Sequence, residues 1–163
     1  MHLSNVICAW TVEAADRLAF EAGRLHLDLR DVAALTLIAT HRGCSMDWLE
    51  PRVGLSQSGT VRLVDRLERN GLVHRARHGR AVALSVTADG QSRVEVWSSA
   101  RDEAVGELLS GLDAGQRETL AEILAAAVSS RPRARHAADR ACRTCQWPAC
   151  GDDCPVDQSA AAP

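Results

Sequence analysis

The sequence predicts a mostly α-helical fold that contains one small β-hairpin. Three observations lead to this prediction. Apolar residues recur at helical spacing toward both ends of the chain, over residues 5–27 and 88–130. Between them, residues 55–70 form an amphipathic pattern that ends in Asn70-Gly71, two residues that tolerate the left-handed backbone of a helix cap. Two short runs with strand character follow directly, and together they predict a hairpin.

Each element is expected from its own start and stop signals. The expected helices cover residues 5–27, 29–40, 46–53, 55–70, 88–110 and 114–128, and the expected strands cover residues 72–77 and 81–86. Asp28, Ser45, Thr87 and Asp113 have side chains that can cap the N-termini of four of these helices. Pro51 falls inside the third helix and removes a hydrogen bond there, so we expect that helix to be short or distorted.

A capped helix with a polar outer face, followed at once by an Arg-rich hairpin, indicates a winged helix-turn-helix. In that fold the helix lies in the major groove of DNA, and the hairpin touches the backbone or the minor groove. The net charge of −2 for the whole chain gives no support to DNA binding. The distribution of charge does, because the segment 52–80 holds seven arginines against two acidic residues.

The residues expected to contact DNA belong to the 55–70 helix and the hairpin, and all but Thr60, which shares the inward face with Leu63 and Leu67, are expected to point outward. They are Ser56, Gln57, Ser58, Thr60, Val61, Arg62, Arg66, Arg69, Arg75, Arg77 and Arg80. Gln57 and Arg62 are expected at base edges, because Gln can pair with adenine and Arg with guanine. Most other arginines are expected at phosphates, with Arg80 at a phosphate or in the minor groove. Asp65 would repel phosphate and should instead orient an arginine.

These residues resemble the MarR family of bacterial winged-helix transcription regulators, over roughly residues 5–130. The most specific part is GLSQSGTVRLVDRLERNGLV, followed by RAVALSVTADG. The resemblance implies a homodimer whose first and last helices interlock. It also implies two recognition helices that reach successive major grooves of a pseudo-palindromic operator. Many members of the family are repressors that a small ligand or thiol oxidation releases, so a small-molecule effector is a further expected partner.

The chain beyond residue 130 contains four closely spaced cysteines: Cys142, Cys145, Cys150 and Cys154 have the spacing C-x2-C-x4-C-x3-C, and Pro155 follows. Four thiolates within 13 residues can surround one metal centre, because each short loop turns the next sulfur back toward the first. Zinc binds such sets tetrahedrally, and bacterial ferredoxin runs end in Cys-Pro as this one does. A 4Fe–4S cluster is slightly favoured over zinc, and a redox-active cluster of metal-free thiols is the third interpretation.

The expected division of the chain follows from these segments. A winged-helix domain is expected over residues 1–130, with a DNA-binding lobe at about 29–87 and dimerisation helices at about 5–27 and 88–130. It is followed by a basic linker over 131–141, a cysteine-rich metal-binding motif over 142–155 and a disordered tail over 156–163. The start of the chain does not resemble a signal peptide, and no apolar run is long enough to span a membrane. We therefore expect a cytoplasmic bacterial protein that is associated with the nucleoid when it is bound to DNA and has no membrane partner.

Two functions compete at this point. The first is a homodimeric regulator that binds double-stranded DNA and is switched by a metal or redox centre in its cysteine motif. The alternative is a small metal-cluster or redox protein whose winged helix serves protein–protein contacts. The Arg-rich helix favours the first. The sequence holds no Ser-His-Asp set, no paired carboxylates and no phosphate-binding Gly-rich loop, so we expect no enzymatic activity.

Overall fold

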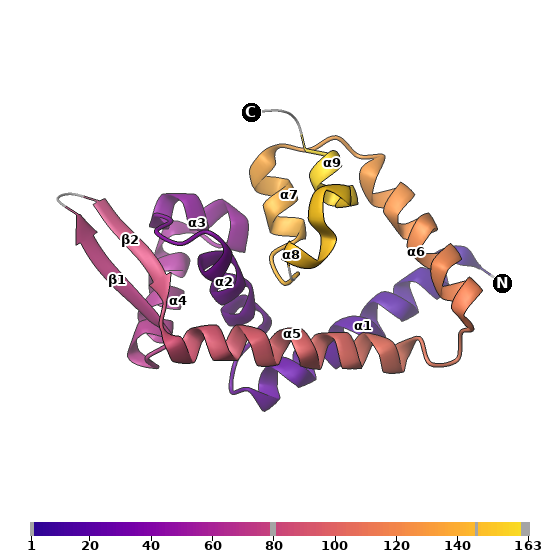
Figure 1. Ribbon diagram of the computed structural model, residues 1–163, viewed down its shortest axis with the longest axis horizontal. Coiled ribbons are helices and arrows are strands. Elements are labelled where there is room, and N and C mark those ends of the chain that lie inside the picture. The colour runs from indigo at the N-terminus through magenta and orange to yellow at the C-terminus, as the bar shows by residue number, and fades with distance from the viewer. Residues whose placement is uncertain (1, 79–80, 146, 161–163) are drawn as a thin grey trace.

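A computed structural model describes residues 2–78, 81–145 and 147–160. The helices and strands are α1 (Leu3–Arg24), α2 (Leu29–Thr40), α3 (Met46–Val53), α4 (Gln57–Arg69), β1 (Val73–His78), β2 (Ala81–Val86), α5 (Ala88–Leu108), α6 (Ala114–Ser129), α7 (Arg135–Ala141), α8 (Trp147–Cys150), the 3₁₀ turn η1 (Gly151–Asp153) and α9 (Pro155–Gln158). The fold is mostly helical with one two-stranded hairpin, as the sequence predicts. Figure 1 shows three parts: a lobe with the hairpin at its outer end, a layer of long helices, and a small C-terminal unit between them.

The lobe is formed by α2, α3, α4 and the hairpin, and it has a continuous apolar core. The strands pair antiparallel, from Val73 opposite Val86 to His78 opposite Ala81. Leu35 of α2, Leu67 of α4 and Leu84 of β2 are at most 1% exposed. Trp97 of α5 is equally buried and belongs to the same core, so the lobe is packed directly onto that long helix.

The predicted caps are present. The carboxylate of Asp28 accepts hydrogen bonds from the first turn of α2, and Ser45 and Thr87 do the same for α3 and α5. Asp113 forms a capping box with Gln116 at the start of α6. The third helix is short, as expected, and it tolerates Pro51 in its last turn.

Several expected boundaries differ from the structure by one to three residues, and two of these differences have a clear physical cause. The first helix ends at Arg24 and does not reach residue 27, because the chain reverses through His26, whose φ is +57°. The turn carries Leu27 into the core, where it is 8% exposed. The first strand begins at Val73, one residue later than expected, because Leu72 donates its N–H to the Leu67 carbonyl and still belongs to the end of α4.

The long helices leave wide apolar faces uncovered. α1 and α5 pack against each other, and α6 runs back from the far end of α5 (Figure 1). α6 has no buried residue at all. The exposed apolar side chains on these three helices are Leu3, Val6, Ile7, Val12, Phe20, Val96, Val105, Ile123 and Leu124. A second molecule packed on these helices would bury this surface.

The C-terminal segment is more ordered than its composition suggests. The expected linker contains the helix α7, and the expected disordered tail begins inside α9 and continues to a bridge between Arg133 and Ala160. Ala138 and Asp139 of α7 are buried, and these tertiary contacts outweigh the polar, small-residue composition. Residues 161–163 lie outside the described part of the chain. None of the helices in the described ranges is long and apolar enough to cross a membrane.

Candidate functional site

The helix α4 presents the outer polar face that the sequence predicts. Its inner face is formed by Leu63, Val64 and Leu67, which are at most 3% exposed. The side chains of Ser56, Gln57, Ser58, Val61, Arg62, Arg66 and Arg69 are exposed. Ser56 caps the helix by accepting a hydrogen bond from the Gly59 amide at 3.3 Å. The exposed amides and side chains at this N-terminus therefore form a surface that favours anions.

Arg62 is held along this surface. Its Nε donates to the Ser58 carbonyl at 3.2 Å, and its Nη2 lies 3.4 Å from the Ser58 hydroxyl. These contacts direct the guanidinium toward the N-terminal end of α4. A recognition helix contacts bases with its N-terminal residues, so Arg62 stands where a base edge would be met.

Thr60 does not belong to this surface, and its predicted contact with DNA is wrong. Its side chain is 1% exposed, and its hydroxyl donates to the Ser56 carbonyl at 3.1 Å. Thr60 lies three residues before Leu63 and seven before Leu67, which is the spacing of the inner face. Its polar side chain is accommodated in the core because the hydroxyl satisfies its hydrogen bond on the backbone.

Two of the arginines expected at phosphates are engaged within the protein. Arg66 pairs with Asp31 at 2.5 Å and with Asp28 at 3.2 Å. The hydrogen bond to Asp31 raises the pKa of Arg66 above its ordinary value. This set ties α4 to the N-terminus of α2, and Arg66 has less freedom to meet a phosphate than the sequence suggests.

Arg75 of β1 is the second engaged arginine. It pairs with Asp65 at 2.6 Å and with Glu68 at 3.3 Å, so the prediction that Asp65 orients an arginine is confirmed. These two pairs fix the hairpin against α4. The side chains of Arg69 and Arg77 remain exposed, whereas Arg80 lies outside the described residues.

The four cysteines of the tail gather around one cavity. The cavity has a volume of about 70 Å³, and its walls include Cys142, Cys145, Cys150, Cys154 and Trp147. We call residues 135–160 the cysteine module. The prediction that short loops bring the four sulfurs to one place is thus matched by their positions. In the part of the chain that the structure describes, no three metal-binding side chains already surround a single point.

Contacts among the thiols distinguish Cys142 and Cys145. Cys142 is 8% exposed and its thiol hydrogen bonds to Cys145, which raises the pKa of Cys142. The same hydrogen bond, together with the positive charges of Arg101 and Arg143, lowers the pKa of Cys145 to about 7. Cys154 is within hydrogen-bonding reach of both Cys142 and Cys150. A readily formed thiolate beside close sulfur neighbours suits a soft metal ion.

The cavity and its donors fit a thiolate-bound metal centre. Four sulfurs line a space large enough for a small centre, and two arginines offset the negative charge that deprotonated thiols would carry. Cys44 lies outside this set, and burial raises the pKa of its thiol to about 11, which makes it unreactive. Cys8 is exposed on α1.

Three residues join the module to the lobe and were not predicted from the sequence: Arg52, Asp139 and Trp147. Arg52 Nε donates to Asp139 Oδ2 at 2.7 Å, and both side chains are largely buried. One signal was available, because Asp139 is the only acidic residue in the basic segment 131–143. A lone acid among arginines indicates a specific partner.

Comparison with known proteins agrees with this geometry. Residues 27–81, which comprise the lobe, match the model of the MarR family. No relative was found among the curated proteins. The similar solved structures include MepR of Staphylococcus aureus, a transcription regulator of the multidrug efflux pump MepA, with a TM-score of 0.72 and 19% identity over 80% of this chain and 98% of MepR.

Two further structures show the same fold. Wild-type MarR of E. coli in its apo form has a TM-score of 0.68 and 20% identity, over 76% of this chain and 94% of that one. The F27L mutant of S. aureus MepR bound to an oligodeoxyribonucleotide has a TM-score of 0.63 and 20% identity, over 80% of this chain and 98% of that one. Nearly all of MepR therefore has an equivalent here, whereas a fifth of this chain has none in MepR.

The hairpin and the exposed helix α4 define a winged-helix fold. The sequence of its lobe matches the model of the MarR family, and the solved structures that share its fold are MarR-family regulators. Members of this family are transcription regulators and not enzymes, in agreement with the prediction that this chain has no enzymatic activity.

Proposed function

We propose that the protein binds DNA as a homodimer, on a pseudo-palindromic operator, and represses transcription from it. The observation that carries this proposal is the outer face of α4, where Gln57, Ser58 and Arg62 are exposed above a fully packed inner face. Exposed polar side chains near the start of a rigid helix are suited to base edges in a major groove. A dimer places two such helices in successive grooves, and a protein held there blocks access to the site.

The uncovered apolar faces support the homodimer. Ile7 and Phe20 on α1 are 54% and 61% exposed, and Ile123 on α6 is 60% exposed. Burying each such side chain contributes about 1.5–3 kcal/mol. The helices that carry them flank the lobe, so pairing through α1, α5 and α6 leaves both copies of α4 accessible to DNA.

We further propose that the cysteine module holds a metal centre that switches DNA binding. Cys142, Cys145, Cys150 and Cys154 would be its ligands. The Cys-Pro ending of the motif favours a 4Fe–4S cluster, whereas the close approach of the thiols favours zinc. Tetrahedral zinc–sulfur bonds of about 2.3 Å require neighbouring sulfur atoms to lie about 3.8 Å apart. The Cys142 thiol already lies within hydrogen-bonding distance of the thiols of Cys145 and Cys154, which is a similar spacing. When bound, zinc would supply a structural cross-link, and a cluster would add redox sensitivity.

The metal is identified by anaerobic purification followed by metal analysis and a visible spectrum. We expect about one zinc per chain and no colour, or a brown protein with a broad sulfur-to-iron band and about four irons per chain. Cys142→Ser should abolish either centre, because this buried thiol contacts two others. Cys8→Ser is the matched control and should leave the metal content unchanged, since Cys8 is exposed on α1. A metal-free protein with unmodified DNA binding would contradict the proposed centre.

The alternative function, a metal or redox protein that uses its winged helix for protein contacts, predicts a different outcome. Selection of bound fragments from a random DNA pool would then enrich no motif, although the metal centre is intact. The engaged arginines Arg66 and Arg75 are compatible with both functions, whereas the exposed Arg62 favours DNA.

A further inference from the structure

We infer that the cysteine module is a strut that fixes the DNA-binding lobe relative to the long helices, so that loss of its metal releases the recognition helix α4. The inference rests on the proposed function and names the route by which the module regulates DNA binding. The module contacts α3 and the turn before α4 on one side, and α5 and α6 on the other. Figure 1 shows it between the lobe and α6, beside α5.

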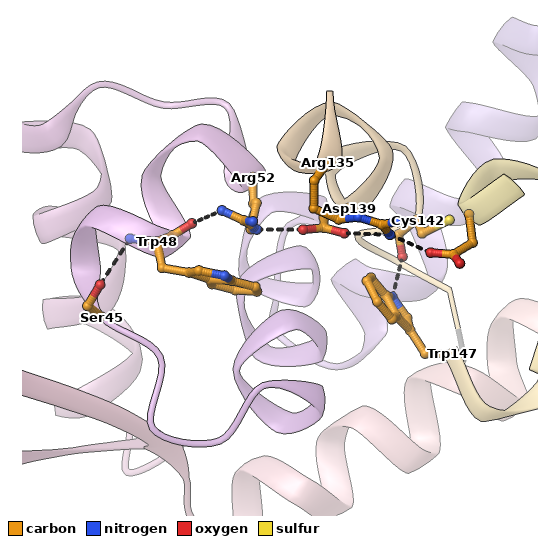
Figure 2. A network of polar contacts seen from close by, with 8 residues as sticks. Ser45, Trp48, Arg52, Arg135, Asp139, Cys142 and Trp147 are labelled. Atoms are coloured by element: carbon orange, nitrogen blue, oxygen red, sulfur yellow. Dashed lines mark hydrogen bonds and ion pairs between the residues drawn. The ribbon is translucent and has the colours of Figure 1, made fainter. Parts of the chain in front are cut away.

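The first contact is a buried ion pair on α3. Arg52 and Asp139 are joined at 2.7 Å, with side chains that are 12% and 4% exposed. Arg52 is itself held in place, because its guanidinium stacks over the Trp48 ring at 3.9 Å and donates to the Trp48 carbonyl at 2.8 Å (Figure 2). Asp139 has a second, longer pair with Arg135 at 3.9 Å, but separating it from Arg52 would remove the closest partner of two largely buried charges, so α7 and α3 move together.

The second contact is aromatic and comes from within the cysteine motif. Trp147 lies between Cys145 and Cys150 in the sequence, and its indole N–H donates to the Cys142 carbonyl at 3.1 Å (Figure 2). The rings of Trp147 and His41 are nearly perpendicular, with centroids 4.9 Å apart, and the His41 ring in turn packs on the Trp48 ring with centroids 4.5 Å apart. A displacement of the loop between these cysteines therefore alters the packing at the end of α2 and on α3.

The third contact lies at the turn that leads into α4. Gly54 has a φ of +70°, and the guanidinium of Arg140 is so close that a Cβ at Gly54 would stand 2.6 Å from its central carbon. Arg140 follows Asp139 directly and precedes Cys142 by two residues. The module thus touches the turn of the helix-turn-helix itself.

The opposite side of the module is tied to the long helices. The Thr144 carbonyl, between two of the cysteines, accepts hydrogen bonds from Arg101 at 2.9 Å and from Trp97 at 3.4 Å, both on α5. Arg133 donates to the Val128 carbonyl at the end of α6 and, through its amide, to the Ser159 carbonyl. The module therefore connects the lobe to the helices whose apolar faces are expected to pair.

The position of the lobe on these helices decides how far apart the two recognition helices of a dimer stand. A metal bound by all four thiols would close the loops that carry Trp147 and Thr144 and would hold α7 in place. Without the metal, the contacts of these short segments with α3 and α5 loosen. The lobe then has more freedom, and ordering it on DNA costs affinity. Loss of the metal should weaken operator binding.

The test uses the full-length, metal-loaded protein and its chelator-treated form. Removal of the metal should raise amide hydrogen exchange over residues 46–56 by about tenfold and weaken operator binding by about 5- to 150-fold. Asp139→Asn keeps all four thiols but loses the ion pair with Arg52, so exchange over 46–56 should already be faster than in the metal-loaded wild type when metal is bound. Chelation should then change this exchange by less than about twofold. Asp152→Asn, an exposed acid of the same module, should respond as the wild type does.

Unchanged exchange over 46–56 when the measured metal content falls would overturn the strut. A response of Asp139→Asn to chelation that equals that of the wild type would also overturn it. Tighter DNA binding after chelation also contradicts it. If the protein takes up no metal, the proposed metal centre is wrong, but the strut can still be tested by comparing hydrogen exchange in Asp139→Asn with that in the wild type. Faster exchange over residues 46–56 in the variant supports the strut, and equal exchange overturns it. Hydrogen exchange needs no operator, so failure of DNA binding does not obscure the result.

Discussion

Raising the salt concentration from 50 to 200 mM should weaken operator binding by about a hundredfold. Each protomer presents Arg69 and Arg77 as exposed cations that are expected at phosphates, which gives four in a dimer. Each phosphate that is neutralised releases condensed counterions, so log Kd should rise with log salt with a slope of about 3.6. Fluorescence anisotropy with a labelled operator measures this slope.

The structure refines which arginines contribute to that slope. Arg77→Ala should reduce it by about two for a dimer, because one phosphate contact is lost in each protomer. Arg66→Ala should instead lower stability, since Arg66 is paired with Asp28 and Asp31. A change in affinity of less than about tenfold over this salt range would contradict the assignment of the exposed arginines to DNA.

Replacing Gly90 with alanine should destabilise the protein by about 2–3 kcal/mol. Gly90 lies in the first turn of α5, and a Cβ there would stand 2.0 Å from the Leu72 carbonyl oxygen and 3.3 Å from Val86. The carbonyl belongs to backbone that joins α4 to the hairpin, so it cannot rotate away as a flexible side chain would. The clash should separate α5 from the lobe, and urea unfolding measures the loss.

Gly106→Ala is the matched control in the same helix. A Cβ at Gly106 meets nothing within 4 Å. Alanine has the higher helix propensity, so this substitution should stabilise the protein by about 0.5–1 kcal/mol. If Gly90→Ala unfolds within about 0.5 kcal/mol of the wild type, the close approach of α5 to Leu72 is wrong.

Local signals explain what could be predicted from the sequence. The caps at Asp28, Ser45, Thr87 and Asp113 act within one helical turn, so each could be identified from the residues around it. The inner face of α4 follows from periodicity alone. The same periodicity places Thr60 on that face, and its assignment to DNA failed because residue type was given more weight than position.

Long-range contacts explain what could not be predicted. The ion pair of Arg52 with Asp139 joins residues 87 positions apart, and nothing near either residue specifies the other. The order of α7 and α9 depends on this packing, because their composition alone is typical of a linker and a tail. Likewise, Arg66 and Arg75 resemble free phosphate ligands until the fold brings their acidic partners beside them.

The site formed by the four cysteines could be predicted in part, because its clustering is local but its position in the fold depends on long-range contacts. Their spacing predicts that four sulfurs meet, and all four line one cavity. The spacing does not specify where that cavity lies. The cavity lies against α3 and the turn before α4 because Trp147 packs on His41 and Asp139 pairs with Arg52. Neither residue is a part of the cysteine spacing from which the metal site was predicted.

Selection of bound fragments from a random DNA pool measures sequence-specific binding by paired α4 helices. We expect enrichment of a palindrome whose half-sites are centred about 10 base pairs, or a multiple of this, apart. Arg62→Ala should relax the preference at one position of each half-site and cost about 1–3 kcal/mol per contact. Arg117→Ala, an exposed arginine on α6, should select the same motif as the wild type. If a folded, metal-loaded protein enriches no motif, α4 does not act as a sequence-reading helix.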